Sequence, residues 1–104
     1  MELNEYQKKA RATAVYSYYA DIPYCSIGLA GEVGEVCNLT KKMLRDDDGQ
    51  LTESRKEKFK DECGDVLWYL SALCGDVGVT LDDVAQYNLD KLAQRKKENT
   101  LRGR

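Results

Sequence analysis

The sequence contains no histidine, a single proline and no CxxC pair among its four cysteines. Without histidine, the chain lacks the usual general base and any Ser-His or Cys-His nucleophile system. The cysteine spacing does not match a zinc site and is typical of reduced thiols, so we expect Cys37, Cys63 and Cys74 to be small buried hydrophobes. Any chemistry must therefore use carboxylates, lysines, tyrosines or a metal ion.

Long apolar runs are also missing. No stretch approaches the roughly 20 apolar residues of a membrane span, and the N-terminal segment MELNEYQKK has no apolar signal core. A cytoplasmic protein without membrane contact is expected. The net charge of −2 gives no reason to bind long nucleic acid, although the basic stretch QRKKENTLRGR could hold a small anion. With 104 residues, we expect one domain spanning 1–104.

The apolar residues that are present recur with helical periodicity. The pattern predicts helices over about 3–19 and about 24–45, a third opened by Thr52 and ending near Gly75 and Gly78, and a fourth from Thr80 to about residue 97. Along the third helix, apolar residues alternate at spacings of four and three: Phe59, Cys63, Val66, Leu70, Leu73 and Val77. Short connections predict an all-α fold, either an antiparallel four-helix bundle or a pair of helical hairpins.

Two pairs of acids stand inside the second and third helices: Glu32 with Glu35, and Glu62 with Asp65. Folding these helices about the centre of the DDDGQ turn brings Glu35 level with Glu62, and Glu32 level with Asp65. Four carboxylates at one level raise one another's pKa unless a cation joins them, and Mg²⁺ prefers such oxygen ligands. The alternative is two solvated helix faces whose acids pair with neighbouring lysines.

Glycines flank the acids at positions 31, 34 and 64, which predicts a close approach of backbone or ligand there. The DDDGQ turn does not match a calcium loop of the EF-hand type. Two positions that need oxygen ligands would fall on Leu44 and Arg55. We therefore expect a solvated turn with Gly49 in a left-handed conformation.

The fourth helix carries an amide and two cations, Asn88, Lys91 and Arg95, on one helical face. Folding this helix back about Gly78 predicts that the three residues lie level with the acids. Beside a metal site, such a set is suited to gripping a phosphate chain. The alternative is an ordinary solvated basic helix end.

Together, GLAGEVGEV, KDECGDVLWYL and YNLDKLAQR resemble the MazG-like nucleotide pyrophosphohydrolases of the all-α NTP pyrophosphatase superfamily. The pattern of that family is ExxE, a spacer and ExxD, followed by an asparagine and a lysine on a later helix. The resemblance implies that Mg²⁺, or Mn²⁺ in its place, is bound by four acids: Glu32, Glu35, Glu62 and Asp65. It implies phosphate contacts for Asn88 and Lys91, with Arg95 beside them. Similar proteins assemble as homodimers or homotetramers with sites between helices of different subunits.

The activity implied is hydrolysis of a (deoxy)nucleoside triphosphate to the monophosphate and pyrophosphate. A metal-activated water attacks the α-phosphorus, and Glu35 or Glu62 takes the proton. Trp68, Tyr69 and residues of the first helix are candidates for an apolar, aromatic base pocket. Two alternatives stay open: a dUTP- or dCTP-selective pyrophosphatase of the same superfamily, and a non-catalytic helical interaction module whose acids form only a solvated face.

Overall fold

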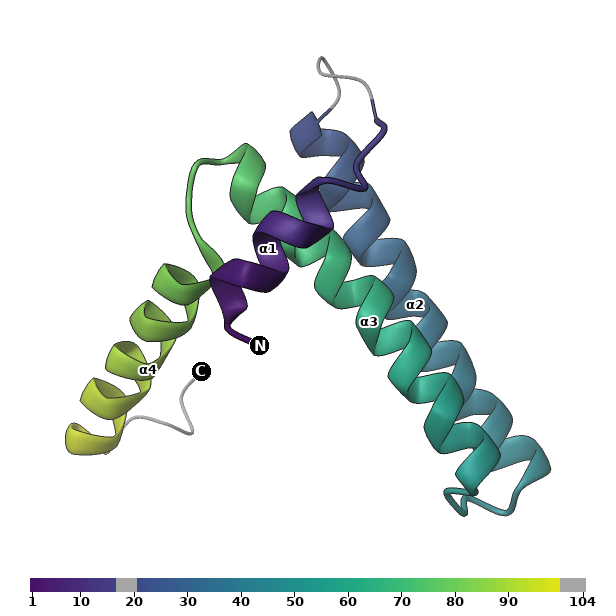
Figure 1. The fold of residues 1–104 in the computed structure, drawn as a ribbon. Helices are drawn as coiled ribbons and strands as arrows, with labels where there is room; N and C mark the ends of the chain where they lie inside the picture. Colours follow the sequence, from purple (N-terminus) through teal and green to yellow (C-terminus); the bar gives the residue numbers. More distant parts are fainter. Residues whose placement is uncertain (17–20, 100–104) are drawn as a thin grey trace.

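The computed structural model describes residues 1–16 and 21–99, which form four α-helices (Figure 1). These are α1 (Leu3–Arg11), α2 (Asp21–Asp46), α3 (Glu53–Asp76) and α4 (Leu81–Lys97). No strand occurs in the described ranges, so the all-α class is confirmed. In the same ranges, no helix combines the length and the apolar character that crossing a membrane requires.

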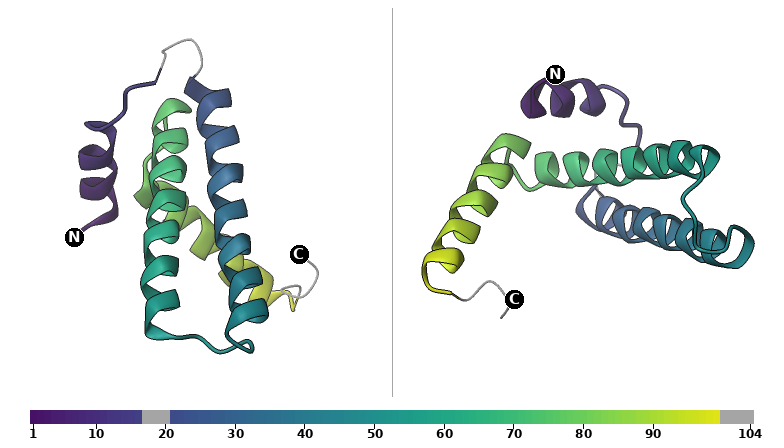
Figure 2. Two further views of the ribbon diagram at one scale, coloured as in Figure 1. Left: turned by 90° about the vertical axis from the view of Figure 1, so that its right-hand side faces the viewer. Right: turned by 90° about the horizontal axis from the view of Figure 1, so that it is seen from below.

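The centre of the molecule is an antiparallel hairpin in which α2 packs along α3 (Figures 1 and 2). The predicted turn joins them, with Asp48 and Gly49 both at positive φ, 53° and 74°. Arg55 fastens this turn, since its Nε donates to Asp47 Oδ2 at 2.8 Å. As predicted, Thr52 caps α3, and its hydroxyl accepts from the Arg55 amide.

The first helix ends earlier than its sequence predicts. Helix α1 stops at Arg11, so the predicted continuation is wrong over 12–16; the positions 17–19 lie outside the described residues. The amide and hydroxyl of Thr13 both donate to the carbonyl of Ala10, which closes the last turn.

The second helix begins earlier than predicted: α2 starts at Asp21 rather than near 24. Pro23 falls in its first turn, where a missing amide proton costs no helical hydrogen bond.

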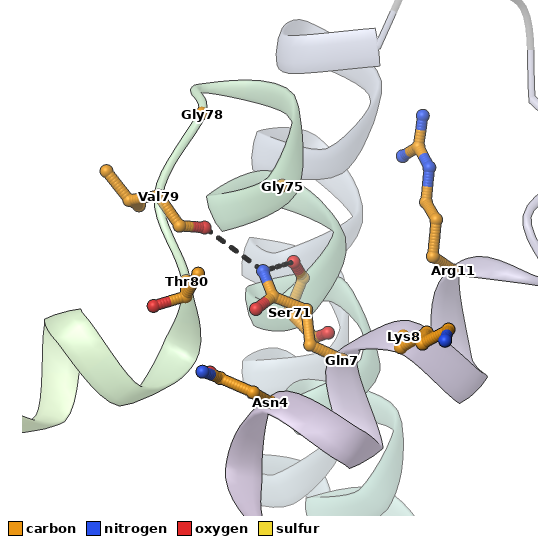
Figure 3. Close-up of a pocket in the computed structure, with 9 residues that line it drawn as sticks. All are labelled: Asn4, Gln7, Lys8, Arg11, Ser71, Gly75, Gly78, Val79 and Thr80. Atoms are coloured by element: carbon orange, nitrogen blue, oxygen red, sulfur yellow. Dashed lines mark hydrogen bonds between the residues drawn. The ribbon is translucent and has the colours of Figure 1, made fainter.

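Helix α1 lies across α3 and holds the start of α4. The first three amides of α4 are accepted in turn by side chains of Gln7, Asn4 and Thr80. The Gln7 amide group also donates to the carbonyls of Ser71 and Val79, at 3.3 and 3.1 Å. These residues surround a pocket of about 420 Å³ at the corner between α1, α3 and α4 (Figure 3). Two side chains of α1 thus cap amides of α4 beside Thr80, the residue at which the predicted fourth helix begins.

Helix α4 leaves the hairpin, and the two form an open V (Figures 1 and 2). Its main contacts are with α1. The prediction that folding about Gly78 sets Asn88 to Arg95 level with the acids of the same chain is therefore wrong. The reason is that α1 occupies the corner and fixes the N-terminal end of α4 through Asn4 and Gln7. One chain is a helical bundle that stays open on the side of α4.

The buried core of the described chain is small and consists mainly of small side chains. The apolar members are Ala10, Cys25, Leu39, Ala72, Cys74 and Leu81. Larger residues stay exposed, such as Ile27 at 73% and Leu89 at 60%. The expected burial of Cys74 is confirmed, but it is wrong for Cys37 and Cys63, which are exposed. Figure 1 shows the reason: α1 crosses only the upper part of the hairpin and leaves the rest uncovered.

Candidate functional site

Three of the predicted acids converge where α2 faces α3. One carboxylate oxygen each from Glu32, Glu62 and Asp65 lies within 4.8 Å of the others. Glu32 comes from α2, and the other two lie one turn apart on α3, so the cluster follows from the predicted register of the hairpin. Glu35, one turn further along α2, is exposed and outside this set.

The electrostatics of the cluster are those of uncompensated like charges. The pKa of Glu62 lies above its usual value, first because the carboxyl is partly removed from water and then because Glu32, Asp65 and Glu35 repel its negative form. The ion pairs found in residues 1–16 and 21–99 involve other acids: Glu5, Asp46, Asp47 and Asp76. Lysines therefore do not neutralise the cluster as the solvated-face alternative requires. Oxygen donors at this spacing fit a divalent cation.

A pocket of about 390 Å³ opens beside the acids, lined by Thr13, Glu32, Asp65, Trp68 and Tyr69. Two members of the cluster and both predicted aromatic residues therefore share one cavity. The sequence predicts that residues of the first helix take part in this pocket but does not single out Thr13, which follows the end of α1 at Arg11 instead of lying within the helix. Its hydroxyl accepts the indole N–H of Trp68 at 2.8 Å.

The aromatic side of the pocket is a connected set of rings. Trp68 meets Tyr69 edge to face, with centroids 5.1 Å apart, and Tyr69 lies 6.2 Å from Tyr24. A hydrogen bond with the Tyr24 hydroxyl, followed by burial, raises the pKa of Tyr69. The Trp68 N–H is held by Thr13 and is not available to a ligand. The rings therefore offer flat apolar surface to a ligand.

Close packing occurs at a different glycine from those predicted. A Cβ added at Gly31, Gly34 or Gly64 would meet no atom of the described residues within 4 Å, so the expected close approach is not made among residues 1–16 and 21–99. At Gly28, a Cβ would lie 2.2 Å from Cε1 of Tyr69. Among the described residues, the close contact that requires a glycine is therefore the one at Gly28, where the missing side chain lets the Tyr69 ring lie against α2.

The three predicted phosphate ligands lie away from the acids of their own chain. Lys91 and Arg95 line a pocket of about 490 Å³ on α4. Asn88 lines an apolar pocket of about 270 Å³ together with residues of α1 and α3. Neither cavity includes a member of the acidic cluster. Their role in binding phosphate stays a prediction.

Known proteins share the sequence pattern that carries this site. A family model described as the MazG nucleotide pyrophosphohydrolase domain matches residues 25–100, a range that includes Glu32, Glu62 and Asp65. The chain belongs to the MazG nucleotide pyrophosphohydrolase family. The Gene 37 protein of Mycobacterium phage L5 is 38% identical over 109 residues, which covers 99% of this chain and 96% of that relative. No solved structure matches. The MazG match begins after α1, so α1 and Thr13 lie outside it.

Proposed function

We propose that this protein hydrolyses nucleoside triphosphates to the monophosphate and pyrophosphate in a Mg²⁺-dependent reaction. The observation that carries the proposal is the convergence of Glu32, Glu62 and Asp65 at the edge of a pocket walled by Trp68 and Tyr69. Acids for a cation and flat rings for a base, within one cavity, suit a nucleotide whose phosphates share the cation. Membership of the MazG family supports the same chemistry.

Each site residue has a role in this reaction. Glu32, Glu62 and Asp65 hold the ion through their oxygens, and Glu35 adds negative charge from the next turn of α2. When bound, Mg²⁺ or Mn²⁺ supplies positive charge to the phosphates and lowers the pKa of a water molecule. Glu35 and Glu62 are the proposed acceptors of the proton that this water loses as it attacks the α-phosphorus. No covalent nucleophile is required.

The site is completed, in this proposal, by a second copy of the chain in a homodimer or homotetramer. The open V leaves apolar side chains of α4 uncovered, among them Tyr87 at 74% exposure and Leu89 at 60%. The acids carry uncompensated negative charge, whereas the last turn of α4 is basic. We therefore assign Asn88, Lys91 and Arg95 to the phosphates held by the acids of a neighbouring subunit. Residues 1–104 form one domain in this proposal.

A product assay tests the function. The protein is incubated with a panel of ribo- and deoxynucleoside triphosphates in Mg²⁺, Mn²⁺ or EDTA, and pyrophosphate is scored against orthophosphate. We expect pyrophosphate and monophosphate, and only with metal. Replacing a carboxylate that holds the ion, Glu62→Gln, should lower turnover by about 100-fold or more. The control Glu57→Gln, an exposed acid on the same helix, should stay within about twofold.

Other outcomes of this assay have defined meanings. Equal turnover in EDTA, or release of orthophosphate, contradicts the proposal. Hydrolysis confined to dUTP or dCTP would select the base-specific alternative. Absence of turnover together with no thermal shift in Mg²⁺ or Mn²⁺ would favour the non-catalytic interaction module.

A further inference from the structure

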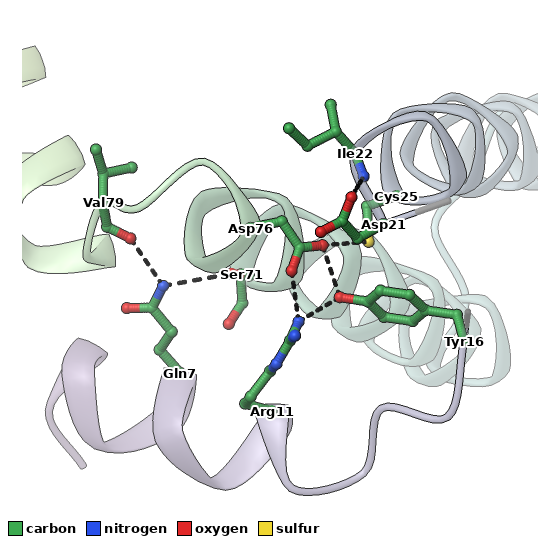
Figure 4. Close-up of polar contacts among 9 residues, drawn as sticks. All are labelled: Gln7, Arg11, Tyr16, Asp21, Ile22, Cys25, Ser71, Asp76 and Val79. Atoms are coloured by element: carbon green, nitrogen blue, oxygen red, sulfur yellow. Dashed lines mark hydrogen bonds and ion pairs between the residues drawn. The ribbon is translucent and has the colours of Figure 1, made fainter. Parts of the chain in front are cut away.

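A buried acid outside the metal cluster ties three elements together. Asp76, the last residue of α3, has a side chain that is only 2% exposed. Its Oδ1 accepts from Arg11 Nη1 at 2.7 Å, and its Oδ2 accepts from the Tyr16 hydroxyl at 2.7 Å and from Cys25 Sγ at 3.4 Å (Figure 4). Arg11 Nη1 also donates to the Tyr16 hydroxyl. The end of α1, the connecting segment and the start of α2 therefore meet at one carboxylate.

Stability alone does not account for such an arrangement. Taking a carboxylate out of water costs several kcal/mol, and apolar replacements of buried ion pairs are often as stable or more stable. Burial alone would raise the pKa of Asp76, but the hydrogen bonds from Tyr16, Cys25 and Arg11 outweigh it and lower the pKa. The acid thus stays charged and keeps its donors in one geometry.

Two of these donors, Arg11 and Tyr16, flank the part of the α1–α2 connection that reaches the pocket beside the acidic cluster. Thr13 stands between Arg11 and Tyr16, lines the pocket beside Glu32 and Asp65, and accepts the N–H of Trp68. The Tyr16 ring lies edge-on to Trp68 with centroids 6.4 Å apart, and it stacks on Tyr24 at 5.1 Å. Fixing Arg11 and Tyr16 on either side of Thr13 therefore fixes the part of the wall that Thr13 contributes to the pocket.

We propose that Asp76, through Arg11 and Tyr16, is a positioning residue for the nucleoside part of the substrate: it holds residues 12–16 as the wall against which base and sugar pack. The inference rests on the proposed function. Asp76 contacts none of the three clustered acids in the described chain, so it is not a catalytic residue. Its effect should reach the nucleoside and leave the metal and the phosphates alone.

Binding measurements with matched probes test this role without turnover. The nucleotide probes are the α,β-imido analogues of the common ribo- and deoxynucleoside triphosphates, dUTP included, with Mg²⁺, and the phosphate-only probe is inorganic tripolyphosphate with Mg²⁺. Tyr16→Phe removes the hydroxyl but keeps the ring, and Asp76→Asn removes the charge. Asp46→Asn is the control, because it removes another arginine-paired carboxylate at the far end of the hairpin.

For the analogues that wild type binds, Tyr16→Phe and Asp76→Asn should raise the dissociation constant by about tenfold, as expected when a charged hydrogen bond is lost. Binding of tripolyphosphate and of Mn²⁺ alone should stay within about twofold, as should all values for Asp46→Asn. In hydrolysis of the same nucleotides, the loss should appear in KM and leave kcat within about twofold.

Two results would overturn the inference. One is unchanged analogue binding in a variant whose melting curve shows it folded; if Asp76→Asn does not fold, Tyr16→Phe decides. The other is an equal loss for tripolyphosphate, which indicates a general structural effect. Failure of wild type to bind any analogue, ribo- and dUTP analogues included, would instead contradict the proposed function, and this inference would fall with it.

Discussion

Glu62 and Asp76 lie on the same helix, and their environments shift their pKa values in opposite directions. Partial removal from water and the repulsion of neighbouring carboxylates raise the pKa of Glu62. Burial acts the same way on Asp76, but hydrogen bonds from Tyr16, Cys25 and Arg11 lower its pKa overall. Asp76 has a positive partner, Arg11, within the chain. In the proposed function, Glu62 instead receives a cation from solution, which would relieve the repulsion of its neighbours.

The pH dependence of stability should reveal the repulsion at Glu62. Between the ordinary glutamate value of 4.5 and the raised pKa of Glu62, the folded chain holds more protons at this residue than the unfolded chain does. The metal-free protein therefore loses stability as pH rises through this interval, and the loss remains at higher pH. In EDTA, Glu62→Gln should gain stability relative to wild type between about pH 4 and pH 7. Urea unfolding followed by circular dichroism measures the difference.

Saturating Mn²⁺ supplies the matched control for this experiment. Wild type should then become the more stable protein, because a ligand that binds only the folded state adds its binding free energy. A stability difference that does not vary with pH, and that Mn²⁺ does not reverse, would contradict the assignment of Glu62 to the cluster.

Among the elements, the α2–α3 hairpin carries the site, and its packing depends on a missing side chain at one position. Gly28 lets the Tyr69 ring lie against α2, whereas Gly31, one turn further along, faces no atom that a Cβ would meet within 4 Å. Both glycines lower the helix propensity of α2 by about 1 kcal/mol relative to alanine. Among the described residues, only Gly28 of these two is required by a packing contact.

Alanine substitution should separate these two glycines. Gly28→Ala should destabilise the protein by about 1 to 3 kcal/mol, since the new methyl group overlaps the Tyr69 ring in a packed contact. Gly31→Ala should instead stabilise it by about 0.5 to 1 kcal/mol. Thermal unfolding measures both. Equal effects of the two substitutions would show that the Tyr69 contact does not govern the packing of the hairpin.

At the scale of the whole molecule, the open V leaves the acids and the basic face of α4 apart. Burial within one chain is limited to small side chains and Leu39 and Leu81, while large apolar residues of α4 remain exposed. A second copy can cover this surface and bring its Lys91 and Arg95 to the acids. If each site is shared between two subunits, two inactive variants should restore activity when their subunits mix. Light scattering reports only the size of the oligomer and cannot test this.

Subunit mixing tests this arrangement. Glu62→Gln removes an acid and Lys91→Ala a phosphate contact, and each should lower the activity of its own oligomer by about 30-fold or more. After exchange in an equal mixture, half of the dimers carry one intact site, so about a quarter of the wild-type activity should return. Glu62→Gln mixed with Asp65→Asn is the control, and should recover nothing because both damage the same acid set.

Failure to recover activity would show that acids and phosphate ligands act within one subunit. A monomeric particle in light scattering at micromolar concentration would contradict the assembly itself. Either result would withdraw the contribution of a second subunit, whereas the cluster of Glu32, Glu62 and Asp65 within one chain would be unaffected.

The sequence by itself determined α2, α3 and α4, the caps at Thr52 and Thr80, and the meeting of Glu32 with Glu62 and Asp65. Helical periodicity and caps are set by residues close together in the sequence. The meeting of the acids follows because they lie at nearly equal distances from the short turn that joins α2 and α3. Family membership also followed from sequence motifs.

Only the tertiary structure decided where α1 ends, how Thr13 enters the pocket, and which way α4 points. These features rest on side-chain contacts between residues more than 50 positions apart, such as Arg11 with Asp76, Thr13 with Trp68, and Gln7 with the first amide of α4. No local pattern encodes such pairings, because each donor becomes specific only when packing brings its acceptor within reach and removes water from around it.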